Sequence, residues 1–152
     1  VLLSLAVLFQ VFFAGTLLAG SPPQISLKAE KSFYNDMKSK EASIKAKMRL
    51  RNGKTCGELS RAIKEYEQGV WMLSKMIVDL KQQIKELQKQ LQTDLIRDKL
   101  KLRLYLFKEW KKILKESKEQ LSTLKQTATR KGCHANLINP CKTQPNGQLR
   151  CS

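Results

Sequence analysis

The chain is poor in the residues from which catalytic and metal sites are built. Among its 152 residues there is one histidine, His134, which follows Cys133. A catalytic Cys–His pair needs a free thiolate, whereas four cysteines in an oxidising compartment are expected to be paired. The cysteine spacing matches no usual zinc-ligand pattern, and a glycine-rich phosphate loop is lacking. We therefore expect no catalytic residue, metal site or cofactor, and no enzymatic activity.

Charge is missing from the first 27 residues. Residues 1–19 are almost all apolar, small residues follow at Ala19-Gly20-Ser21, and Lys28 is the first charged residue. This layout is typical of a secretory signal peptide, which we assign to residues 1–20 and which is incomplete because it lacks a methionine and a basic start. A membrane anchor is the alternative, since such a run just spans a bilayer. The even cysteine count favours secretion to the extracellular space.

The hydrophobic pattern that follows predicts an all-α protein. A first helix is expected over residues 27–51, where apolar side chains recur on one helical face. A second helix is expected to begin at Thr55, which has the spacing of a capping box with Glu58. It carries a heptad seam from Leu59 to Leu91, with gaps that alternate between four and three residues.

The heptad seam breaks after Leu91. Its next two positions are occupied by Asp94 and Asp98, and a new seam begins at Ile96 with an offset of two residues. Because neither a stutter nor a stammer gives this offset, we expect a turn over residues 92–95, with Thr93 or Asp94 as the new N-cap. One continuous helix in a parallel oligomer is the alternative, and the oligomeric state stays open.

The cysteines fit a helical hairpin. Cys56 and Cys133 lie at nearly equal distances from the expected turn, so two antiparallel helices would bring them to the same end. We favour the pairing Cys56–Cys133 with Cys141–Cys151, although a bond from Cys56 to Cys141 or Cys151 stays open.

The expected architecture is a disulfide-stapled antiparallel helical hairpin with an additional N-terminal helix, which makes a three-helix bundle. The helical domain covers residues 21–131. The third helix has an apolar face wide enough to contact both other helices. Residues 132–152, which contain Pro140 and Pro145, are expected to form an irregular tail pinned by its cysteines.

Basic residues outnumber acidic ones by 29 to 13, a net charge of +16 that favours acidic partners. Where the basic clusters meet, we expect a site for a glycosaminoglycan or an acidic protein surface; an anionic membrane surface is a third candidate, and nucleic acid is not expected on a secreted protein. A solvated helix surface is the alternative for each cluster. The candidate residues are Lys45, Lys47, Arg49, Arg51 and Lys54 around the first turn, Arg97, Lys101, Arg103, Lys108, Lys111, Lys112 and Lys115 on the third helix, and Arg130 with Lys131.

The segment from Lys99 to Lys118 is also similar to a cationic membrane-active helix, because apolar residues share it with lysines and with Trp110. The second helix offers an apolar face that can cover it, and burial of both faces is favourable. We therefore expect this segment to be part of the bundle.

The combined features resemble a known family. A signal peptide, a basic mature chain, long heptad helices and the four cysteines Cys56, Cys133, Cys141 and Cys151 resemble the anophensin and albicin type of small helical salivary proteins of anopheline mosquitoes. The resemblance covers the architecture of the mature chain and transfers no binding residue. It implies a non-enzymatic inhibitor of contact-pathway coagulation or complement. We expect such an inhibitor or a polyanion binder; a cytokine-like signalling factor and a cationic membrane-active defence or venom protein are the alternatives.

Overall fold

Three long helices and a short C-terminal β-hairpin make up the part of the chain that the structure describes. The computed structural model describes residue 24 and residues 28–48 and 55–152. Its elements are α1 (Lys28–Lys47), α2 (Cys56–Lys89), α3 (Asp94–Arg130), α4 (Ala135–Ile138), β1 (Cys141–Thr143) and β2 (Leu149–Cys151). The expected signal peptide lies outside the described residues.

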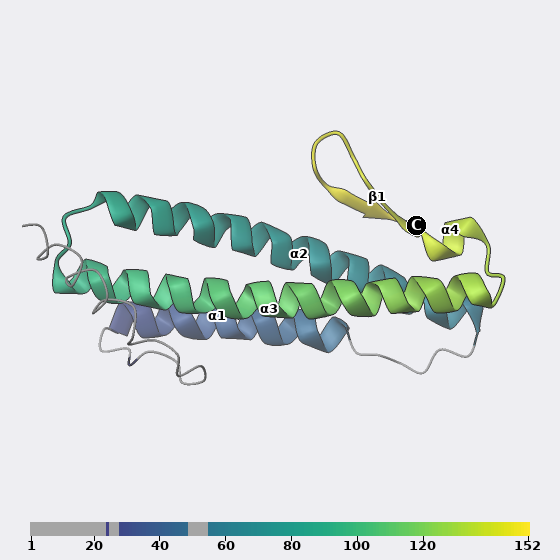
Figure 1. Cartoon of the computed structure of the whole chain (residues 1–152), viewed down its shortest axis with the longest axis horizontal. Helices are drawn as coiled ribbons and strands as arrows, with labels where there is room; N and C mark the ends of the chain where they lie inside the picture. Colours follow the sequence, from purple (N-terminus) through teal and green to yellow (C-terminus); the bar gives the residue numbers. More distant parts are fainter. Residues whose placement is uncertain (1–23, 25–27, 49–54) are drawn as a thin grey trace, which may run out of the picture.

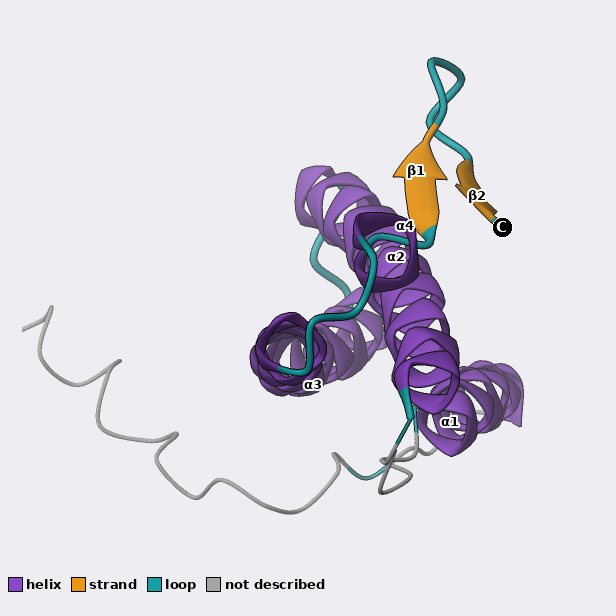
Figure 2. Ribbon diagram, turned by 90° about the vertical axis from the view of Figure 1, so that its right-hand side faces the viewer, coloured by secondary structure: helices purple, strands orange, loops and turns teal. Residues whose placement is uncertain are grey.

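The helices form the expected bundle. Figure 1 shows α2 and α3 running antiparallel along most of their length, with α1 packed against this pair. The end view shows that the β1–β2 hairpin projects from the α2 side of the bundle (Figure 2). The all-α prediction is therefore confirmed, and within the described ranges no helix has the length and apolar character needed to cross a bilayer.

Side-chain caps set where α2 and α3 begin. The Thr55 hydroxyl accepts a hydrogen bond from the Glu58 amide, and the Glu58 carboxylate accepts one from the Thr55 amide, both at 3.2 Å. The hydroxyl of Thr93 accepts from the amide of Ile96 at 3.3 Å. These contacts satisfy amides that lack partners within the helix. The capping box and the turn at residues 92–95 are confirmed, and the continuous-helix alternative is wrong.

The heptad seam of α2 stops sooner than its sequence pattern predicts. α2 ends at Lys89, so Leu91, which the pattern places in the seam, is 85% exposed in the turn. The chain must leave the helix before residue 93 to let Thr93 cap α3. Turn geometry therefore overrides the apolar pattern at this position.

The buried face of α3 changes along the helix. Trp110 and Leu124 of the predicted seam are buried, whereas toward the start of the helix Leu102 and Leu106, which lie beside the seam, are buried and the seam residue Leu100 is only half-buried. The physical reason is that α3 packs against α1 as well as α2, because Trp110 contacts residues of both. The centre of the buried face of α3 therefore lies between its contact with α1 and its contact with α2.

Gly69 allows α1 to approach α2 closely. A Cβ at this position would lie 2.6 Å from Met48 Cγ and even closer to Met48 Sδ. Met48 and Ile44 are buried at this contact, together with Leu73 of α2. A larger side chain at residue 69 would displace the Met48 side chain from this contact.

The tail is more regular than the sequence suggested. Disulfides join Cys56 to Cys133 and Cys141 to Cys151, which is the favoured pairing. The tail is pinned by its cysteines as predicted, and within it β1 and β2 form a short antiparallel hairpin that the sequence pattern did not indicate. Its turn contains Gly147 with a φ of 77°, a conformation that glycine adopts without strain.

Candidate partner-binding surface

Several acidic side chains are turned toward the interior of the bundle. Glu30 and Glu41 are buried, and Glu67 is mostly buried and bonded to Lys125 at 2.6 Å. A buried carboxylate must find cationic or hydrogen-bonding partners to offset its desolvation. Each of these carboxylates therefore takes lysine or arginine partners, and those basic side chains are engaged within the protein.

Glu41 joins α1 to α3. Its side chain is 6% exposed and accepts hydrogen bonds from Lys38 at 2.7 Å and Lys45 at 2.9 Å. It also accepts one from Nε1 of the fully buried Trp110 at 3.1 Å. Burial by itself would raise the pKa of Glu41, but the hydrogen bonds from Lys38 and Lys45 outweigh burial and hold that pKa below its ordinary value. Lys45, a predicted binding residue, thus has a structural role as well.

Arg103 differs from the other candidates of α3. Its guanidinium pairs with Glu30 of α1 and lies 4.0 Å from the ring centre of Phe33. It also donates a hydrogen bond to Gln83 of α2 at 3.3 Å, and its side chain is only 11% exposed. The prediction that Arg103 belongs to the partner-binding surface is therefore corrected: it holds three helices together.

Four exposed lysines form a line along α3, which we name the α3 stripe: Lys101, Lys108, Lys112 and Lys115. Together with Tyr105 they are separated by four, three, four and three residues. This spacing keeps side chains on one face of a helix. Because a helix rises about 1.5 Å per residue, the stripe is about 20 Å long.

The central lysines of the α3 stripe have no ion-pair partner among the described residues, although the Glu109 and Glu116 carboxylates lie within about one helical turn of Lys112. No ion pair or hydrogen bond joins Lys108 or Lys112 to another residue in the described part of the chain. At the two ends, Lys101 lies 3.7 Å from Asp98 and Lys115 lies 4.0 Å from Glu119. Such exposed pairs are weak. The ammonium groups of the stripe are therefore available to an external anion.

Tyr105 sits within the α3 stripe and is half-buried. Burial raises the pKa of its phenol, and the nearby Glu109 carboxylate raises it further. The phenol therefore stays neutral and offers a hydrogen-bonding group between Lys101 and Lys108. The sequence marked Tyr105 only as a residue suited to a membrane interface, although the alternating spacing of residues 101–115 also places it among the lysines of the stripe.

The end of α1 lies beside the middle of α3. Lys45 lines a hollow of about 310 Å³ together with Glu116, Ser117 and Gln120 of α3. Lys47 is exposed at the same end of α1. The end of α1 therefore approaches α3, but no predicted basic residue of α3 lines this hollow. Arg49, Arg51 and Lys54 lie outside the described residues.

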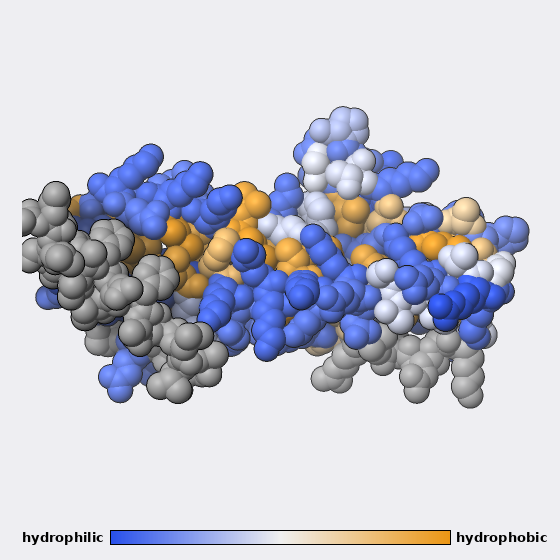
Figure 3. Space-filling model, in the orientation of Figure 1, coloured by the Kyte–Doolittle hydropathy of each residue, from blue (hydrophilic) through white to orange (hydrophobic). Residues whose placement is uncertain are grey.

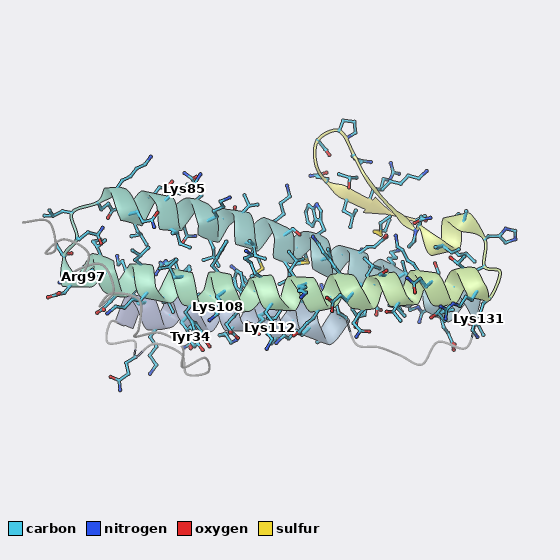
Figure 4. The ribbon with its side chains drawn as sticks, viewed as in Figure 1. Tyr34, Lys85, Arg97, Lys108, Lys112 and Lys131 are labelled. Atoms are coloured by element: carbon cyan, nitrogen blue, oxygen red, sulfur yellow. A yellow bond between two sulfur atoms is a disulfide. The ribbon has the colours of Figure 1, made fainter. Side chains whose placement is uncertain are left out.

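The remaining candidates are spread over the molecule. Figure 4 places Arg97 near the α2–α3 turn and Lys131 at the opposite end of α3, with Lys108 and Lys112 between them. Arg97 pairs with Asp94. Arg130, which precedes Lys131, is exposed. Arg97 lies only four residues before Lys101, whereas Arg130 and Lys131 are separated from Lys115 by about 22 Å of helix. The predicted residues therefore do not form a single site.

Lys111 lies on another face of α3. Its ammonium is 5.5 Å from the ring centre of Phe107, a cation–π arrangement. Figure 3 shows apolar residues exposed in a band between α2 and α3, bordered by hydrophilic side chains of both helices. Lys111 therefore lies against Phe107 rather than within the α3 stripe.

The apolar residues of the segment 99–118 are used inside the protein. Leu102, Leu106 and Trp110 pack against Leu80 of α2, with Phe33 of α1 at the same cluster. A membrane-active helix must present such residues to lipid. In this bundle they are covered by neighbouring helices, as expected.

The described surface lacks the side chains of a metal site, and known proteins offer no match to the chain. Among the described residues, no group of three or more histidine, cysteine or acidic side chains is placed to hold a metal ion. Family models, curated proteins and solved structures were compared with this chain, and none matches.

Proposed function

We propose that this protein is a secreted, non-enzymatic binding protein whose α3 stripe recognises an extended polyanion, with a sulfated glycosaminoglycan as the leading class. The observation that carries the proposal is the exposed pair Lys108 and Lys112 at the centre of the stripe, neither of which has an ion-pair partner among the described residues. The two disulfides are compatible with an extracellular location.

The linear arrangement favours a chain over a compact anion. A small anion is bound by groups that converge on one point, whereas the lysines of the α3 stripe follow the helix axis. A polymer with regularly spaced sulfates or carboxylates can contact all of them. Lysine suits this role because its flexible stem allows the ammonium to meet charges whose positions vary.

Heparin binding tests this proposal. The Lys108→Gln/Lys112→Gln double variant should bind heparin about tenfold more weakly at moderate salt, because two charge contacts are lost. The matched control is Lys81→Gln/Lys85→Gln, which removes two exposed lysines from α2 and should change the affinity less than about twofold. Affinity is measured by isothermal titration calorimetry at several salt concentrations. Equal losses in both double variants would show that net charge alone drives binding and would contradict the proposed site.

Inhibition of a plasma pathway remains a proposal that follows from the family resemblance. Masking a polyanion would block a pathway that is triggered on an anionic surface, and an acidic protein surface would meet the same stripe. Clotting triggered by an anionic surface, and complement activation, are measured with the wild type and the Lys108→Gln/Lys112→Gln variant. Inhibition by the wild type and its loss in the variant would support this role, whereas no inhibition by the wild type would exclude it.

A further inference from the structure

A second candidate site lies between α1 and α2, away from the α3 stripe. It is a pocket of about 360 Å³, and none of its lining residues belongs to α3. Its walls include Lys40 and Ile44 from α1, and Trp71, Met72, Lys75 and Met76 from α2. This volume falls in the range of pockets that bind small molecules.

The inner surface of the pocket is apolar. Ile44 is 1% exposed and forms its base, while Met72 is 37% exposed at its opening. Methionine side chains are flexible and polarisable, so Met72 and Met76 can adapt to ligands of different shape. An aliphatic chain or a ring bound here would remove apolar surface from water, which is favourable.

Trp71 is held in place at the edge of the pocket. Its Nε1 donates a hydrogen bond to the carbonyl oxygen of Gly147 at 3.2 Å. Gly147 belongs to the turn of the β1–β2 hairpin, which the Cys141–Cys151 disulfide closes. The indole therefore presents a preorganised flat surface, so little conformational entropy is lost when a ligand packs on it.

The charge at the rim of the pocket is positive. The ammonium of Lys75 lies 5.6 Å from the ring centre of Trp71, and it has no ion-pair partner among the residues that the structure describes. Lys40 pairs with Asp36 at 2.8 Å on the surface of α1. No acidic residue lines the pocket. An anionic head group would thus find one unneutralised cation beside an apolar surface.

We infer that this pocket binds a small amphipathic anion, in which a carboxylate or sulfonate contacts Lys75 and an apolar chain packs on Trp71, Met72 and Met76. An apolar pocket with few charged groups at its edge selects ligands of this class. A neutral chain would lack the ion pair, and a cationic chain would be repelled.

Intrinsic fluorescence gives a direct test, because Trp71 is partly exposed and the chain's second tryptophan, Trp110, is fully buried. Laurate, below its micelle concentration, is titrated into the full oxidised protein. We expect saturable binding with a blue shift that is absent in Trp71→Phe. The Lys75→Gln variant should bind about fivefold more weakly. Neutral lauryl alcohol should bind about as weakly to the wild type as laurate does to Lys75→Gln.

The Lys108→Gln/Lys112→Gln variant separates this inference from the proposed function, because it alters only the α3 stripe. It should bind laurate as the wild type does. If this variant and Lys75→Gln lost laurate affinity equally, the inference would be overturned, since laurate binding would then depend on the overall charge of the protein. Equal binding of laurate and lauryl alcohol, or laurate binding without a change in Trp71 fluorescence, would also overturn it.

Discussion

Glu41 and Trp110 form a polar contact inside an otherwise apolar contact between α1 and α3. The indole Nε1 of Trp110 has no other hydrogen-bond partner in the described part of the chain. The Glu41 carboxylate also accepts hydrogen bonds from two lysines of its own helix. Leaving either buried group without a partner costs roughly 1–3 kcal/mol. At the scale of residues, this contact fixes the position of α1 along α3.

Replacement of Glu41 tests this role. Glu41→Gln keeps an acceptor for Trp110 but loses both charge-assisted hydrogen bonds. We expect the free energy of unfolding to fall by about 1–2 kcal/mol, a value reduced because Lys38 and Lys45 are partly in water. Urea denaturation followed by circular dichroism measures the change. The matched control is Asp36→Asn, which removes a half-exposed ion pair from the same helix and should cost less than about 0.5 kcal/mol.

The pH dependence of the free energy of unfolding gives a second test of the contact between Glu41 and its partners. The pKa of Glu41 is lower in the folded protein than in the unfolded chain, so its stabilising effect is complete above the ordinary pKa of a glutamate. That effect is lost as the pH falls through the lowered pKa of the folded state. The wild type should therefore lose more stability than Glu41→Gln over this acidic range. Parallel pH profiles would contradict the assignment.

The two disulfides act on different elements. Cys56–Cys133 closes a loop with a sequence separation of 77 and joins the start of α2 to the residues after α3. Cys141–Cys151 closes a separation of 10 within the tail hairpin. Loop-closure entropy rises with the length of the loop. At the scale of elements, the first bond therefore stabilises the α2–α3 hairpin and the second stabilises the tail.

Serine variants distinguish the two bonds. Cys56→Ser/Cys133→Ser should lower the free energy of helix unfolding by about 4 kcal/mol, because the denatured chain gains freedom. Cys141→Ser/Cys151→Ser should leave helix melting almost unchanged while increasing amide exchange in β1 and β2. Far-UV circular dichroism and hydrogen exchange measure these effects. If the second variant lowered helix stability as much as the first, the separate roles proposed here would be wrong.

Over the whole molecule, the net charge of +16 opposes the compact state. Like charges repel one another when the chain folds, and salt screens this repulsion. The exposed ion pairs contribute little in the opposite direction. The lysines thus lower the stability of the folded state, and the same charges give it a surface that can bind anions.

Salt should therefore stabilise the protein. We expect the melting temperature to rise with sodium chloride between low and physiological concentration, since about 1 kcal/mol of relieved repulsion shifts it by roughly 4 °C. Differential scanning calorimetry gives this dependence. Lys81→Gln/Lys85→Gln, with two positive charges fewer, should depend less on salt. A melting temperature that falls with salt would show that ion pairs outweigh repulsion.

Local patterns determined much of the fold. Thr55 with Glu58, and Thr93 at the phase break of the seam, set the helix starts because capping depends on residues only three positions apart. The nearly equal spacing of Cys56 and Cys133 from the turn favoured their pairing, which the structure confirms. The basic character of α3 was also evident from composition, because charge does not depend on packing.

Tertiary structure alone decided which basic residues remain available. Arg103 and Lys108 look alike in the sequence, yet Arg103 is turned toward Glu30 of α1 while Lys108 is exposed. The reason is that α1 packs on α3 through side chains distant in the sequence, and these contacts determine which face of α3 is buried. The pocket beside Trp71 likewise exists only because α1 and α2 meet there, which no local pattern specifies.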